Sequence, residues 1–240
     1  MKTITTVLII LFSNTLIAQC KDTQMVEYLV YLDVTDQEHL NALSEFMPLE
    51  YKAMLDDIET LGAFKKCHGI NLEVYPINDL GDNRGVRIGF EPIGGNLTDV
   101  QIARQIKPKF AVELRDAIKK IISSHNSSYK YTRIYEPLCN ALLKLKKIDQ
   151  EVTIVVFSDM LEHNSTSFYT KGNAIDRDKT IEKMAKQCQC NFKDDLSNAT
   201  IKFVSFRTSS NDRNISNATR FWVDFFQAKK AIVQFGSSLL

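Results

Sequence analysis

Apolar runs alternate with amphipathic stretches along most of this chain. Residues 28–32 and 152–157 are short, apolar and rich in β-branched or aromatic side chains, which is typical of buried central strands. Residues 200–206 predict a third strand of the same kind. Residues 71–77 and 85–90 alternate apolar and polar positions around Asp and Gly turn residues, which predicts an antiparallel hairpin.

Between these runs, apolar residues recur at helical spacing. The predicted helical stretches are 37–61, 98–122, 134–145, 176–190 and 217–230. We expect Pro48 to divide the first stretch into two helical pieces that end near Gly62, because proline interrupts the hydrogen bonds of a helix interior. The second stretch is predicted to be helical despite Pro108.

The order of strands and helices predicts an α/β fold. We expect a Rossmann-like, three-layer, doubly wound and mostly parallel sheet, with one antiparallel strand from the edge hairpin. No Pro- or Gly-rich linker divides the chain, so residues 24–240 are expected to form one domain.

The amino-terminal segment has the layout of a secretory signal. Lys2 precedes an apolar run over 7–12, and Ala18 follows a few polar positions. The run is too short to span a bilayer. We therefore expect residues 1–18 to be cleaved, and the protein to be exported to the periplasm, the outer membrane or the medium.

A competing interpretation makes the protein a lipoprotein. In it, residues 1–19 are removed and Cys20 carries a lipid, although Gln19 replaces the small residue usual before such a cysteine. Contact with a membrane is expected only in this case. The remaining cysteines, Cys67, Cys139, Cys188 and Cys190, form an even set that allows three disulfide pairings. Their spacing matches no structural zinc pattern.

Charge excludes one large class of partner. Lys2 is the only charge in the first 18 residues, which leaves 29 of the 30 Lys and Arg residues against 29 Asp and Glu. Basic and acidic residues are interleaved, whereas nucleic-acid binding needs a concentrated basic face. No nucleic-acid partner is expected.

Two aspartates follow directly on apolar strands. Asp33 ends the first, and Asp159 follows the strand over 152–157. Ligands of parallel sheets bind outside the carboxyl ends of the strands, and a buried carboxylate without a basic neighbour requires compensation. Hard oxygen ligands from Asp and Thr suit Mg²⁺ or Mn²⁺, with Ca²⁺ as an alternative.

These residues stand in an order that resembles a known family. Asp33, Thr35 and Gln37 resemble the Asp-x-Ser-x-Ser signature of von Willebrand factor type A (VWA) domains, and Thr132 resembles the threonine of the second loop. Ser158 with Asp159 is similar to the Ser-Asp-Gly segment of the third loop. The resemblance extends over nearly the whole chain after the signal.

The resemblance implies a metal-ion-dependent adhesion site (MIDAS). Its predicted ligands are Asp33, Thr35, Gln37, Thr132 and Asp159, and an open coordination position would accept a carboxylate from a partner protein. Two departures stand out. Gln37 replaces the second serine, and Met160 replaces the glycine after Asp159. The expected function is a metal-dependent protein-binding module for adhesion or assembly.

Two alternatives remain open. A metal-dependent hydrolase of a phosphate ester needs a base such as Asp36 and a cation such as Arg133 beside the ion. A degenerate domain would keep the fold and bind no metal. His39, His68, His125 and His163 are scattered, and we expect them to be solvent or loop residues.

Overall fold

The computed structural model describes residues 20, 22–78, 85–124, 132–144, 151–162, 168, 176–192, 195–205 and 212–239. The predicted signal segment, the hairpin turn over 79–84, His125 and His163 lie outside the described residues. The strands are β1 (Gln24–Asp33), β2 (His68–Ile77), β3 (Val86–Phe90), β4 (Val152–Phe157), β5 (Ala199–Val204) and β6 (Ile232–Gly236). The helices are α2 (Gln37–Thr60), α3 (Asp99–Ser124), α4 (Tyr135–Lys144), α5 (Arg177–Cys188) and α6 (Asp212–Ala228).

The six strands form a single sheet in the order β3-β2-β1-β4-β5-β6. All neighbours run parallel except β2 and β3, which pair antiparallel. The predicted α/β class, the mostly parallel sheet and the antiparallel edge hairpin are therefore confirmed. Strand β6, which follows directly on the last helix, was not predicted.

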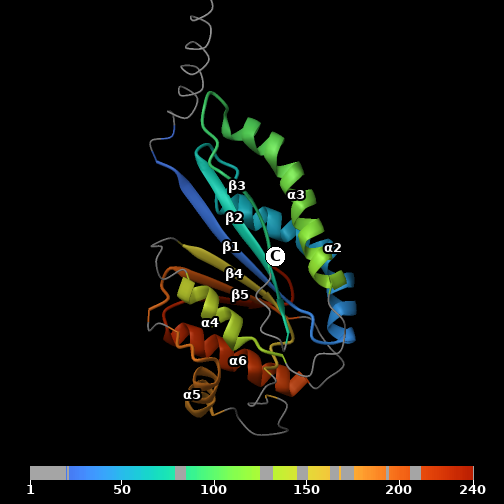
Figure 1. Ribbon diagram of the computed structural model, residues 1–240, viewed down its shortest axis with the longest axis vertical. Coiled ribbons are helices and arrows are strands. Elements are labelled where there is room, and N and C mark those ends of the chain that lie inside the picture. The colour runs from blue at the N-terminus through green and yellow to red at the C-terminus, as the bar shows by residue number, and fades with distance from the viewer. Residues whose placement is uncertain are drawn as a thin grey trace, which may run out of the picture.

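Helices cover both faces of the sheet (Figure 1), as the alternation of side chains along β1 requires. Tyr28, Val30 and Leu32 pack against α2 and α3, whereas Leu29 and Tyr31 belong to the core beneath α4, α5 and α6. Both cores consist of buried apolar side chains, so the strand ends lie between two packed layers.

Helix α2 corrects one prediction. Pro48 lies inside it, and the helix continues without a break from Gln37 to Thr60. Residues on both sides of the proline, including Leu43 and Met54, are fully buried in the same core. Packing of one continuous apolar face thus outweighs the hydrogen bond that proline removes.

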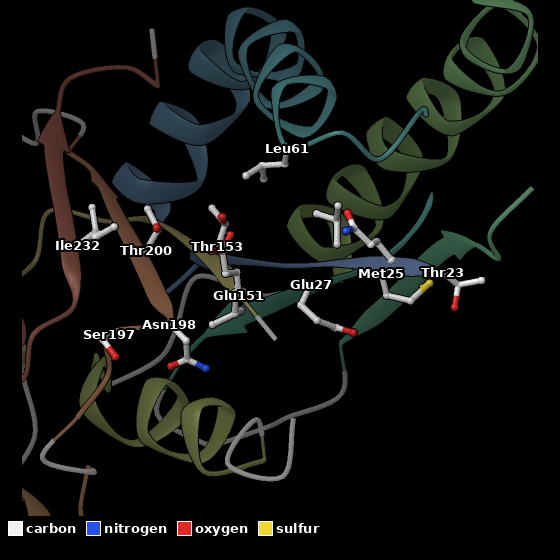
Figure 2. A pocket seen from close by; sticks show the side chains of 13 residues that line it. Thr23, Met25, Glu27, Leu61, Glu151, Thr153, Ser197, Asn198, Thr200 and Ile232 are labelled. Atoms are coloured by element: carbon white, nitrogen blue, oxygen red, sulfur yellow. The ribbon is translucent and has the colours of Figure 1, made fainter. Parts of the chain in front are cut away.

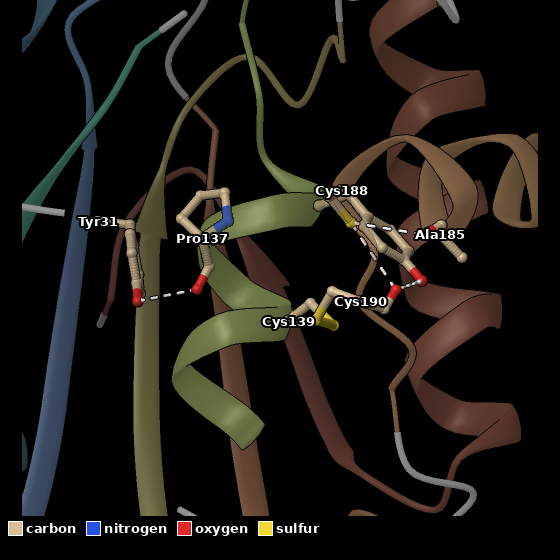
Figure 3. The surroundings of a disulfide bond; sticks show 7 residues. Tyr31, Pro137, Cys139, Ala185, Cys188 and Cys190 are labelled. Atoms are coloured by element: carbon tan, nitrogen blue, oxygen red, sulfur yellow. Dashed lines mark hydrogen bonds between the residues drawn. A yellow bond between two sulfur atoms is a disulfide. The ribbon is translucent and has the colours of Figure 1, made fainter. Parts of the chain in front are cut away.

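Two disulfides cross-link the described part of the chain. Cys20 pairs with Cys67, and Cys139 of α4 pairs with Cys190, just after α5 (Figure 3). Cys188 is a free thiol whose Sγ lies 3.7 Å from the Cys190 carbonyl oxygen. Disulfides persist in oxidising compartments, which agrees with an extracytoplasmic protein. Within the described residues, no helix has the length and apolarity to cross a membrane.

Candidate metal site

The site begins where two central strands end side by side. Strand β1 ends at Asp33, and Ser158 follows the last residue of β4, which pairs in parallel with β1. The Ser158 hydroxyl donates to Asp33 Oδ2 over 2.6 Å. Because both strands run in the same direction, their carboxyl ends bring the first and third predicted loops into direct contact.

The second loop joins the first through hydroxyl groups. Asp33 Oδ1 accepts from the Thr35 hydroxyl at 2.6 Å and from the Thr35 N–H at 3.2 Å. The Thr132 hydroxyl lies 3.3 Å from Thr35 Oγ1. All three side chains are buried. Asp33, Thr35 and Thr132 therefore gather at one edge of the sheet, and Asp159 lies close to Asp33 there, so four of the five predicted ligands come together.

The fifth predicted ligand lies apart. Gln37 is exposed, and its Nε2 donates to Asn41 Oδ1 at 2.9 Å along the outside of α2. The side chain thus interacts with its own helix and does not join the cluster.

The third loop turns sharply after Asp159. Met160 has a φ of 66°, in the left-handed region that favours glycine, so the backbone keeps a glycine-like conformation although the side chain differs. The Trp222 indole N–H of α6 donates to the Met160 carbonyl, and the Met160 N–H donates to Ser158 Oγ. These bonds hold the turn that aims Asp159 at the cluster.

His39 also belongs to this cluster. It was expected in solvent or a loop, but it is 3% exposed in the first turn of α2. Its Nε2 lies 3.3 Å from Asp159 Oδ2 and 3.9 Å from Asp33 Oδ2. One signal was available: His39 precedes Leu43 and Met47 at successive spacings of four, which places it on the buried stripe.

Asp36 fixes the orientation of this histidine. As the N-cap of α2 it accepts the His39 N–H at 2.8 Å, and the same Oδ1 lies 2.6 Å from His39 Nδ1. Burial favours the neutral carboxyl, but the hydrogen bonds from His39 dominate and lower the pKa of Asp36.

The charged groups of the cluster shift one another's pKa. Burial disfavours an imidazolium, yet the charge of Asp33 and the contacts with Asp159 and Asp36 outweigh it and raise the pKa of His39 to about 11. Burial raises the pKa of Asp33, as does the charge of Asp159, against the opposing effects of His39, Ser158 and Thr35. Within the described residues, no Lys or Arg pairs with either aspartate. The arrangement therefore favours a positive charge at its centre.

The donor set fits a cation. One ligand atom each from Asp33, His39 and Asp159 lies within 4.8 Å of the others. Buried Asp159 Oδ2 accepts no well-formed hydrogen bond within the described part of the chain, and His39 is its ion-pair partner. Oxygens of Thr35 and Thr132 stand beside this triad.

A further buried acid links the second and third loops. Glu162 is fully buried, and its Oε2 accepts the N–H groups of Ile134 at 2.6 Å and Tyr135 at 3.1 Å, at the start of α4. Burial raises the pKa of Glu162 to about 8, although these N–H donors and Arg133 act in the opposite direction. Glu162 thus ties the segment after Asp159 to the segment after Thr132.

A cleft of about 460 Å³ lies on the opposite side of the sheet, where the parallel strands begin; we call this the amino edge. Figure 2 shows Glu27, Thr153, Thr200 and Ile232 around it, near the amino ends of β1, β4, β5 and β6. None of the predicted site residues lines this cleft.

No protein-family profile matches this chain, and no curated protein matches it. Solved structures with a similar arrangement include the human COPII-coat protein Sec24c, at 9% identity and a TM-score of 0.38 over 90% of this chain and 30% of that chain. Proximal thread matrix protein 1 from the mussel byssus has 12% identity and a TM-score of 0.38, over 90% of this chain and 42% of that chain. The pilus adhesin SpaC from Lactobacillus rhamnosus GG has 8% identity and a TM-score of 0.41, over 92% of this chain and 29% of that chain.

The chain spans less than half the length of each of these proteins. At this level of similarity the comparisons assign no family. The resemblance to VWA domains stays an expectation from the sequence.

Proposed function

We propose that this protein is an exported, VWA-like protein-binding module whose carboxyl-edge site holds a divalent cation. The observation that carries the proposal is the meeting of Asp33, Thr35, Thr132 and Asp159, which come from three separate loops and are all buried. In this proposal Mg²⁺ or Mn²⁺ binds there, with Ca²⁺ as an alternative, and a partner protein supplies a carboxylate to an open coordination position.

Electrostatics supports a cation at this point. Two buried carboxylates near each other cannot both ionise cheaply without positive charge. The hydroxyls of Thr35 and Ser158 already satisfy both oxygens of Asp33. Asp159 Oδ2 has no such hydroxyl donor among the described residues, and a metal ion would compensate it.

A second candidate is a domain that keeps the fold without a metal. The specific observation in its favour is His39, whose imidazolium lies between Asp33 and Asp159 and can supply the positive charge itself. The hydrolase alternative gains no comparable support. Asp36 is engaged by His39, and Arg133 Nη1 pairs with Glu136 at 3.2 Å.

The compartment is part of the proposal. The sulfur of Cys20 bonds to Cys67, and a sulfur in a disulfide cannot also carry a lipid thioether. This pairing supports cleavage after Ala18 rather than lipidation of Cys20, and release into the periplasm or the medium.

Thermal unfolding tests the metal. We expect the melting temperature of the chelator-treated protein to rise with Mg²⁺ or Mn²⁺, because an ion that binds only the folded state adds about 2.7 kcal/mol at 100 times its Kd. Asp33→Ala should abolish this rise, whereas Glu27→Gln at the amino edge should retain it. An unchanged melting temperature together with no heat of binding would leave only the metal-free candidate.

A carboxylate probe tests the partner. Acetate titrated into Mn²⁺-loaded protein should displace bound water and lower the water-proton relaxation enhancement. Asp33→Ala, which cannot hold the ion, provides the baseline. If acetate leaves the water-proton relaxation enhancement of the Mn²⁺-loaded protein unchanged, the site has no open position for a partner's carboxylate.

A further inference from the structure

We infer that His39 Nε2 is itself a ligand and that the site therefore selects a divalent transition-metal ion, Zn²⁺ or Mn²⁺, over Mg²⁺ and Ca²⁺. This inference rests on the proposed function and names the class of cation. The sequence suggested a site made of oxygen ligands alone, and the structure adds a nitrogen.

Distances support direct ligation. Metal–nitrogen and metal–oxygen bonds of about 2.0–2.2 Å separate neighbouring ligand atoms by roughly 3–3.5 Å. His39 Nε2 lies 3.3 Å from Asp159 Oδ2 and 3.9 Å from Asp33 Oδ2, so small movements of these side chains bring all three onto one ion. The imidazole stands between the aspartates, so an ion held by both carboxylates also meets the ring nitrogen, and its binding releases the Nε2 proton of the imidazolium to solvent.

Asp36 provides a second, independent indication. Histidines that bind metals usually donate their other ring N–H to a carboxylate, which fixes the tautomer and the ring orientation. His39 Nδ1 lies 2.6 Å from Asp36 Oδ1, and Asp36 is held in turn as the N-cap of α2. This arrangement directs Nε2 toward Asp33 and Asp159.

The aspartates are supported in the same manner. Ligating carboxylates are commonly held by hydrogen bonds to their outer oxygens. The outer oxygen of Asp33, Oδ1, accepts from Thr35, while its Oδ2, the oxygen 3.9 Å from His39 Nε2, accepts from Ser158. Asp159 Oδ1 accepts the Leu161 N–H at 2.9 Å. The second oxygen of Asp159 is thereby left facing His39.

The chemistry of the ligands determines which metal ion the site prefers. Mg²⁺ and Ca²⁺ take oxygen ligands almost exclusively, whereas imidazole suits Zn²⁺ and other transition metals, with Mn²⁺ weakest in that series. One nitrogen and two carboxylates should therefore bind in the order Zn²⁺, then Mn²⁺, then Mg²⁺.

Calorimetry on the chelator-treated full-length protein measures this order. We expect Zn²⁺ to bind about 100-fold or more tightly than Mg²⁺. His39→Gln offers an amide oxygen in place of the ring, so it should lose most of this ratio while retaining Mg²⁺ binding. His68→Gln removes a histidine from the amino edge and should leave the ratio unchanged. Asp36→Asn keeps the ligand but weakens its orientation, which should cost about 10-fold in Zn²⁺ affinity.

Pulsed electron paramagnetic resonance of Mn²⁺-loaded wild-type protein provides a readout that depends on no variant. A ¹⁴N coupling from a coordinated imidazole is expected. Metal binding without ¹⁴N coupling, and with similar affinities for Zn²⁺ and Mg²⁺, would overturn the inference and leave the proposed function intact. No binding of any of the three ions would overturn both.

Discussion

The two edges of the sheet both carry buried acids, but they compensate them differently. At the amino edge, Glu27 accepts from Asn71 Nδ2 at 2.7 Å, and Asn71 Oδ1 accepts from Arg87 Nε at 2.6 Å. At the carboxyl edge, Asp33 and Asp159 share one histidine. Glu27 thus accepts from a neutral amide on β2 that is itself held by Arg87 of β3, whereas Asp33 and Asp159 lie around a single positive charge.

This contrast shows what distinguishes a structural acid from a candidate ligand. Burial alone does not, because Glu27 is also buried and burial raises its pKa. The difference lies in the donors around each carboxylate. At the amino edge the Cys20–Cys67 disulfide links two segments covalently. At the carboxyl edge, polar contacts between side chains join the three loops.

The largest expected effect comes from removing the shared charge. His39→Leu leaves Asp33 and Asp159 buried without a cation, which should cost about 3–5 kcal/mol of unfolding free energy in the presence of a chelator. Urea unfolding at neutral pH measures it. A loss below about 1 kcal/mol would mean that the two aspartates do not depend on His39.

The second prediction concerns the Cys20–Cys67 disulfide at the amino edge. Replacing Cys20 and Cys67 together by Ser should cost about 2–4 kcal/mol, because the unfolded chain regains the freedom of the closed loop. Metal affinity should not change, since neither residue lies at the carboxyl edge. A changed ion affinity in this variant would show that the two edges are coupled.

Burial of Glu162 predicts an effect of similar size that depends on pH. Its pKa is about 8 in the folded protein against 4.5 for a free side chain, so the folded state binds the extra proton between these values. Stability should therefore be greatest below about pH 4.5 for this group and fall by on the order of 2–4 kcal/mol as pH rises to 8. Glu162→Gln mimics the protonated acid, and its unfolding free energy should vary less over this range.

The smallest effect is expected at Glu27. Glu27→Gln keeps an oxygen that can accept from Asn71, so the loss should stay below about 1 kcal/mol. Chemical denaturation of Glu27→Gln and His39→Leu under the same conditions measures the two losses of unfolding free energy. Similar losses in both variants would remove the distinction between the edges.

Much of the fold could be predicted because the apolar runs are unambiguous. Strand β4, whose only polar residue is the buried Thr153, and the apolar centre of β1 give no signal for another kind of element. Strand β6 was missed because its five residues are mostly half-exposed or exposed and follow α6 almost directly. The predicted break at Pro48 was wrong because the rule that proline interrupts a helix does not include tertiary packing, which here stabilises α2 on both sides of the proline.

The candidate site was predictable only in part. Asp33, Thr35, Thr132 and Asp159 follow strands or precede a helix in an ordered series, so their convergence could be expected. Glu162 gave no such signal, since it belongs to a loop and bonds to backbone groups 27 and 28 positions away. His39 could have been placed on the buried face of α2, but its carboxylate neighbours come from loops that sequence spacing does not join.

The Cys20–Cys67 disulfide also defines how the molecule would carry mechanical load. A pull on the amino end passes from Cys20 across the sulfurs to Cys67, so β1 and α2 lie in a closed loop outside the path of tension. The cross-linked residues are 47 positions apart, which corresponds to about 160 Å of extended chain. Stretching should expose that length only after reduction, so the central strand that carries Asp33 is shielded from force as long as the disulfide holds.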